Sequence, residues 1–276
     1  MHLCDSNTCN LAPVSTVYGT MDKAEDKIKC LNITLSILRV YGIFPQKNKE
    51  LNPGKAFFIK LAVIAVFCSL TMVGSFLHLI MSLKNGNKFY SVGEDVNNII
   101  SCILSYIMVG MFVYKIKVVA HLYTFLSNFS DFGKPTSFDK VNDRFSVLSK
   151  LHSLILELDI FSILLTSNVL KGDQCGKENV EYGLKEICGL VAYTWMPFDI
   201  DRFPAKQIYL SSQLVGMHYL YFATGTIAWM ILETMNHIIV RIRHVKELFA
   251  DALMEENVQS RREKFNFVVK YHTVVL

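Results

Sequence analysis

The chain has 276 residues, of which 51% are hydrophobic and only 19% are charged. A soluble domain usually carries about 25% charged residues, and here the apolar residues are concentrated in long blocks. This pattern predicts a polytopic membrane protein in contact with a lipid bilayer, and the dispersed net charge of +4 gives no indication of a nucleic-acid partner.

The first 56 residues are mostly polar and are expected to form a cytosolic N-terminal segment. The first 27 residues lack the apolar core of a cleavable signal peptide, so the first true span has to direct insertion. A short amphipathic stretch at 31–40 is interrupted by Gly42-Ile43-Phe44-Pro45. Glycine and the residue before a proline both disfavour a continuing helix, so a short helix is expected to end there.

Four apolar blocks predict an all-α transmembrane bundle over residues 57–237, since each is long enough to cross a bilayer. The spans are expected at about 57–83, 96–114, 150–170 and 210–236.

Ionisable residues within these blocks need an explanation, because charge is costly inside a membrane. The third block carries Glu157 and Asp159, which we expect to be paired or to face water; the alternative is an amphipathic helix on the surface. The fourth carries His218 and Glu233, which lie too far apart along a helix to form a dyad. Glu233 falls at the predicted exit of its span, where we expect it to be solvated.

A polar loop, 171–209, joins the third and fourth blocks and contains Cys175 and Cys188. If this loop lies outside the cell, the two cysteines could form a disulfide, because that compartment permits one. The loop ends in an aromatic and proline cluster, Trp195-Met196-Pro197-Phe198-Asp199. Such a cluster beside an apolar span is typical of an anchor at the membrane interface, although a buried turn before a core helix is the alternative.

Residues 238–276 are expected to form cytosolic amphipathic helices that pack on a partner helix. The chain stops in a new apolar run, which suggests an incomplete chain with four of an expected larger number of spans. Basic residues near the span ends indicate a cytosolic amino terminus; they are Lys55, Lys115, Lys117, Arg241, Arg243 and Lys246.

No metal-binding motif, P-loop, nucleotide-binding glycine turn or nucleophile elbow is found in the sequence. We therefore expect neither an enzyme nor a bound metal or cofactor.

Several of these stretches resemble, in order and spacing, the insect odorant receptor family. Gly42-Ile43-Phe44-Pro45 resembles that family's Gly-x-x-Pro element before the first span. The cluster at 195–199, followed by Pro204 and Gln213, is similar to the loop that leads into the fourth span. Residues 241–248 and Lys270-Tyr271-His272 resemble the cytosolic stretch beyond that span.

The resemblance implies one subunit of a seven-span, ligand-gated cation channel in the plasma membrane of an olfactory neuron's dendrite, assembled with a shared co-receptor into a hetero-tetramer. Its ligand would be a small, volatile, hydrophobic molecule bound in the outer half of the bundle. The sequence departs from the family by lacking the last three spans, which supply the pore.

The resemblance also implies a ligand pocket lined by the second, third and fourth spans, with residues 195–199 shaping the loop above it. By depth alone the expected lining residues are Asn97, Ile100, Ser101, Leu104, Phe161, Leu165, Thr166, Gln213, Met217, Tyr221 and Thr224.

Two alternatives remain open from the sequence. A gustatory receptor of the same superfamily would be distinguished by its last span, which this sequence does not contain. A G-protein-coupled receptor would need an external amino terminus, which the charge pattern opposes, and no Asp/Glu-Arg-Tyr motif follows the third block.

Overall fold

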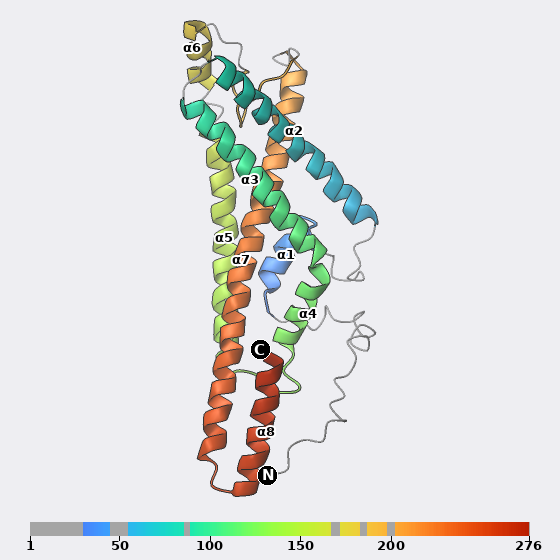
Figure 1. Cartoon of the computed structure of the whole chain (residues 1–276), viewed down its shortest axis with the longest axis vertical. Coiled ribbons are helices and arrows are strands. Elements are labelled where there is room, and N and C mark those ends of the chain that lie inside the picture. Colours follow the sequence, from blue (N-terminus) through green and yellow to red (C-terminus); the bar gives the residue numbers. More distant parts are fainter. Residues whose placement is uncertain are drawn as a thin grey trace.

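The computed structural model describes residues 30–44, 55–85, 89–166, 172–182, 187–197 and 202–275, and the secondary structure of these residues consists of helices without strands, as expected (Figure 1). The helices are α1 (Asn32–Val40), α2 (Lys55–Asn85), α3 (Phe89–Tyr114), α4 (Ile116–Ser127), α5 (Phe138–Leu165), α6 (Gly172–Tyr182), α7 (Ala205–Met254) and α8 (Val258–Val275).

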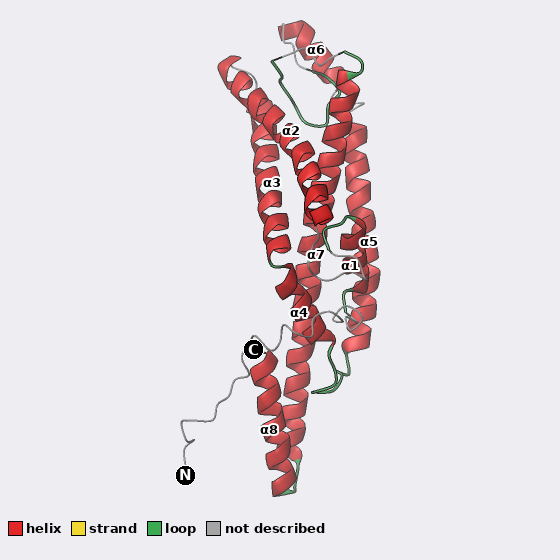
Figure 2. Cartoon of the chain, turned by 90° about the vertical axis from the view of Figure 1, so that its right-hand side faces the viewer, coloured by secondary structure: helices red, strands yellow, loops and turns green. Residues whose placement is uncertain are grey.

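The bundle is arranged along α7, a single helix of 50 residues. At 1.5 Å per residue it is about 75 Å long. Helices α2, α3 and α5 pack against the part of α7 nearer α6, whereas α8 returns beside its opposite end (Figures 1 and 2). One continuous helix therefore connects the two ends of the described structure.

Among the described residues, three helical stretches are long and apolar enough to cross a membrane: Phe57–Lys84, Val92–Tyr114 and Ala205–Met254. They contain the apolar blocks expected at 57–83, 96–114 and 210–236 almost entirely, and the positions of these blocks in a membrane stay predictions. The block expected at 150–170 begins inside α5, which is not among the three, and Glu157 and Asp159 reduce its apolarity. Helix α5 packs along α7. A membrane position for this block stays a prediction.

The amphipathic stretch at 31–40 forms α1 as predicted. The backbone conformation that ends this helix requires a glycine at position 42. Gly42 has a φ of 69°, in the left-handed region that glycine adopts without steric cost. Its N–H donates to the Arg39 carbonyl, and the Ile43 N–H donates to the Leu38 carbonyl at 2.8 Å. This Schellman motif closes the helix and turns Ile43 and Phe44 into the core.

The start of α1 is attached to α4. The Cys30 N–H donates to Ser127 Oγ at 3.2 Å, and the Cys30 thiol donates to the Tyr123 carbonyl. Burial raises the pKa of the Cys30 thiol to about 11, so the thiol stays protonated at neutral pH. The N-terminal helix is thus an integral part of the bundle.

The expectation that Glu233 is solvated is wrong. Its side chain is 2% exposed, because α1 packs against α7 at this level and covers it. The carboxylate accepts hydrogen bonds from Thr34 Oγ1 at 2.6 Å and from Ser149 Oγ at 3.4 Å. Trp229 Nε1 donates to the same Ser149 hydroxyl at 2.8 Å, so one carboxylate joins α1, α5 and α7.

Arg241 makes the corresponding connection beyond the apolar span. It is 2% exposed and donates to the carbonyls of Leu126 at 2.9 Å and Asn128 at 2.6 Å. These carbonyls lie at the end of α4, where the helix leaves them without internal partners. Arg241 also donates to Tyr271 Oη of α8 at 3.1 Å. Within 238–276, the end of α7 therefore packs on α8 and on the end of α4.

The polar loop at 171–209 contains an unexpected helix, α6, and α7 begins at Ala205 rather than near 210. The polar sequence of α6 lacks the apolar periodicity that would have indicated a helix.

Close packing of α2 on α7 depends on Gly216. A Cβ there would lie 3.0 to 3.2 Å from backbone atoms of Phe67 and Cys68. We predict that Gly216→Ala lowers the free energy of unfolding by about 1–3 kcal/mol, since backbone cannot move aside cheaply. Thermal unfolding of the purified protein measures this change.

Gly110→Ala is the matched control, because a Cβ at Gly110 meets nothing within 4 Å. It is expected to be neutral or slightly stabilising, since alanine favours a helix. Equal melting temperatures for the two variants would contradict the proposed helix contact.

Candidate functional site

A small apolar cavity of about 50 Å³ lies between α5 and α7 in the part of the bundle near α6. Its lining residues are Ile160, Ile163, Leu164, Val191, Leu214, Met217, His218 and Tyr221. The α7 members follow the i, i+3, i+4, i+7 spacing that places side chains on one helix face.

His218 is one of two polar side chains at the cavity, and it is connected to α1 and α5. Its Nε2 lies 2.9 Å from Tyr41 Oη, which donates to Glu157 Oε1 at 3.0 Å. The Tyr41 ring stacks on Phe222 with centroids 4.2 Å apart. Glu157 is therefore partnered across the helices, in line with the expectation that it would be paired or face water.

Tyr221 is the second polar side chain at the cavity. Its hydroxyl donates to Asp159 Oδ2 at 3.4 Å, a long hydrogen bond. Both polar groups of the cavity are thus connected to a carboxylate from α5.

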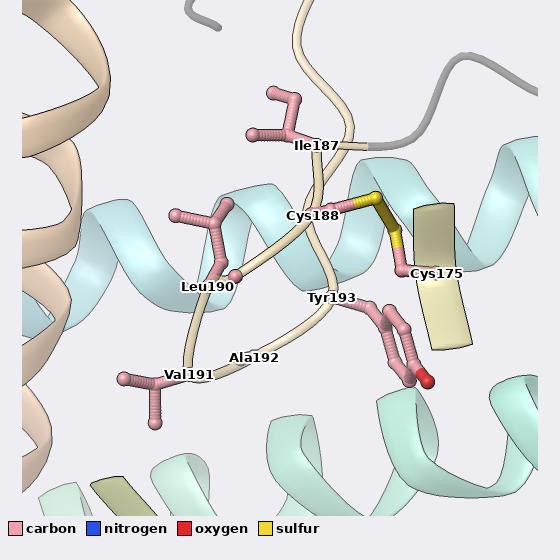
Figure 3. Close-up of a pocket in the computed structure, with 8 residues that line it drawn as sticks. Cys175, Ile187, Cys188, Leu190, Val191, Ala192 and Tyr193 are labelled. Atoms are coloured by element: carbon pink, nitrogen blue, oxygen red, sulfur yellow. A yellow bond between two sulfur atoms is a disulfide. The ribbon is translucent and has the colours of Figure 1, made fainter. Parts of the chain in front are cut away.

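The loop 187–197 covers the cavity at the α6 end. A disulfide between Cys175 and Cys188 ties this loop to α6, and Val191 and Ala192 lie at its tip (Figure 3). A space of about 10 Å³ remains between the loop and the disulfide. Because Val191 also lines the larger cavity, movement of the loop would change the shape of that cavity.

Gln213 holds the tip of the loop on α7. Its side chain is 0% exposed, and its Oε1 accepts from the Val191 N–H at 3.1 Å. Its Nε2 donates to Thr194 Oγ1 at 3.0 Å and to the Ala192 carbonyl at 3.4 Å. Gln213 therefore positions the cover of the cavity rather than lining it.

The same loop is held from its other side by α2 and α3. The Tyr193 ring stacks on His78 with centroids 5.3 Å apart, and His78 Nδ1 lies 2.7 Å from Asp95 Oδ2 in a buried pair. Ser75 Oγ donates to the Tyr193 carbonyl at 3.3 Å. Asp95 immediately precedes the span expected at 96–114, and sequence reasoning did not identify it.

Among the residues expected to line a pocket, the structure brings only Met217 and Tyr221 to the cavity. Thr224 is half-buried and donates to the Leu220 carbonyl within its own helix. The others, Gln213 aside, are exposed on α3 or α5: Asn97, Ile100, Ser101, Leu104, Phe161, Leu165 and Thr166.

In the predicted covering loop, Trp195 is half-buried and its backbone N–H donates to the Gly74 carbonyl at 3.4 Å, whereas Pro197 is exposed. Phe198 and Asp199 lie outside the described residues. The cavity residues that sequence reasoning missed on α7 are Leu214 and His218. An ionisable residue inside an apolar span was the signal that could have identified His218.

We predict that Gln213→Leu releases the covering loop, because it leaves the Val191 N–H without its acceptor. Losing a buried hydrogen-bond partner costs about 1–3 kcal/mol, so amide exchange at Val191 should accelerate about 5- to 150-fold. Hydrogen exchange read by mass spectrometry measures this. Gln207→Leu, at an exposed position of α7, is the control, and unchanged protection at Val191 in Gln213→Leu would contradict the role of Gln213.

No protein-family model and no curated protein sequence matches the chain. Solved structures that share its fold include two of an insect olfactory receptor. The insect olfactory receptor OR5 from Machilis hrabei in complex with eugenol aligns with a TM-score of 0.62 and 14% identity over 88% of this chain. A second structure of OR5 from Machilis hrabei gives a TM-score of 0.61 and 16% identity over the same share of this chain. The chain spans 61% of the length of either structure, and over that length it has the fold of an insect olfactory receptor.

Proposed function

We propose that this chain is the ligand-binding part of an odorant receptor subunit. The bound molecule would be a small, volatile and hydrophobic compound, and the cavity between α5 and α7 would receive it. The observation that carries this proposal is an apolar cavity with two polar groups, covered by a tethered loop, in a chain with an olfactory-receptor fold. Such a lining suits a small apolar ligand whose orientation is fixed by a few polar contacts.

The size of the cavity supports a binding step that moves the helices or the loop. At about 50 Å³ it is well below the roughly 300–1,000 Å³ typical of ligand pockets. A ligand would therefore have to displace the tip of the covering loop or separate α5 from α7. A ligand that binds only the expanded form shifts the population toward it.

The continuity of α7 offers a route from that movement to the other end of the bundle. Met217 and His218 line the cavity, and Arg241 on the same helix holds the end of α4 and Tyr271 of α8. In the proposed receptor, rearrangement at the cavity would gate a cation channel formed together with a co-receptor as a hetero-tetramer in the plasma membrane of olfactory neurons.

We predict that Met217→Trp prevents ligand binding, because the larger side chain would fill a cavity of only about 50 Å³. The protein in lipid nanodiscs would be screened with volatile alcohols, phenols, ketones and ethers for ligand-induced increases in melting temperature. A ligand at 100 times its Kd stabilises the folded state by about 2.7 kcal/mol. The variant should lose this increase while keeping its own fold.

The control is Met235→Trp, which makes the same change at an exposed position of α7 away from the cavity. It should retain the ligand-induced shift. Undiminished shifts in Met217→Trp would show that the ligand binds elsewhere.

A further inference from the structure

The direction of the hydrogen bonds around His218 determines which ligand groups the cavity can recognise. Such recognition rests on the proposed ligand-binding function and deepens it. The Tyr41 hydroxyl has one proton and two neighbours, Glu157 Oε1 at 3.0 Å and His218 Nε2 at 2.9 Å. An ionised carboxylate only accepts hydrogen bonds, so the Tyr41 proton points toward Glu157.

The tautomer of His218 follows from that assignment. With its proton donated to Glu157, the Tyr41 oxygen can only accept, so His218 Nε2 has to carry a proton. A neutral imidazole has one N–H, and its other nitrogen is then an acceptor. Nδ1 of His218 is therefore an acceptor, and among the described residues it has no hydrogen-bond partner of its own.

The second polar group of the cavity has the same character. Tyr221 donates its hydroxyl proton to Asp159 Oδ2, which leaves the lone pairs of its oxygen as acceptors. Glu157 and Asp159 are carboxylates of α5 two residues apart in the chain. By accepting these protons they leave both polar side chains of the cavity as acceptors. The remaining lining residues are aliphatic or Met217 and supply no hydrogen-bond donor from their side chains.

We propose that the cavity selects ligands that bear a hydroxyl group, namely small alcohols or phenols, over otherwise matched ethers and ketones. A hydroxyl group can donate its hydrogen to His218 Nδ1 or to the Tyr221 oxygen. An ether or ketone has only acceptors, and the polar side chains of the cavity are acceptors as well. Tyr41 and Glu157 are positioning residues for this selection, because they fix the proton on His218 without lining the cavity.

The test compares matched pairs of probes, each an alkylphenol or alcohol with its methyl ether, over a series of chain lengths. Dissociation constants would be measured in nanodiscs at pH 8. The hydroxyl member of a pair should bind at least about tenfold more tightly, which corresponds to one hydrogen bond of about 1.4 kcal/mol.

Two variants test the direction of the hydrogen bonds. Tyr41→Phe keeps a ring to stack on Phe222 but removes the acceptor that holds the proton on Nε2. Glu157→Gln introduces an amide that can donate as well as accept, so the Tyr41 proton is no longer directed. In both variants His218 can carry its proton on Nδ1. The dissociation constants of the hydroxyl probe and its ether should then become nearly equal. A purely structural loss would weaken both members of a pair equally and leave their ratio unchanged.

Tyr219→Phe is the matched control, since it removes the same atom from a buried tyrosine of α7 whose hydroxyl has no hydrogen-bond partner among the described residues. Its ratio should remain that of the unmodified protein. Equal binding of ethers and alcohols would overturn this inference and leave the proposed function intact. A preference that survives Tyr41→Phe and Glu157→Gln unchanged would also overturn it. Binding of no probe at all would contradict the proposed function and the inference together.

Discussion

A buried polar group without a partner costs free energy comparable to a lost hydrogen bond or more, and this constraint organises the bundle along α7. Four polar side chains of that helix, three of them buried, find partners on other segments of the chain. Gln213 holds the covering loop, His218 meets the end of α1, Glu233 joins α1 to α5, and Arg241 holds α4 and α8. Each group is an exception in a largely apolar sequence, and each marks a place where segments distant in the chain come together.

The proposed function follows from where these connections lie. The cavity lies between α5 and α7, with the covering loop at one end and Tyr41 behind His218. Its boundaries are therefore defined by hydrogen bonds, which are directional and can be exchanged, rather than by apolar packing alone. A ligand that rearranges them would act on α1 and on α7 together. Both reach toward the α8 end, α1 through Cys30 on α4 and α7 through Arg241.

Long apolar blocks and one short amphipathic stretch were sufficient to predict the class of fold and the first helix, because these are local properties of the sequence. The same reasoning failed for Glu233, since its burial depends on α1, which lies about 200 residues away in the chain. It also failed for the rotation of the helices. The residues expected on α7 began at Gln213, but contact of Gly216 with α2 turns Leu214 and His218 toward the cavity. On α3 the expected residues point outward, because they were chosen by depth, and depth in a membrane does not define which face of a helix packs inward.

Photo-crosslinking tests the location of the ligand site most directly. A diazirine derivative of a volatile compound that binds the chain would be irradiated with the protein in nanodiscs, and labelled residues identified by mass spectrometry. The account predicts labels within 160–164 of α5 and 214–221 of α7, with loss of labelling when the parent compound competes. Competable labels confined to Ile100 and Leu104 on the exposed face of α3 would contradict it.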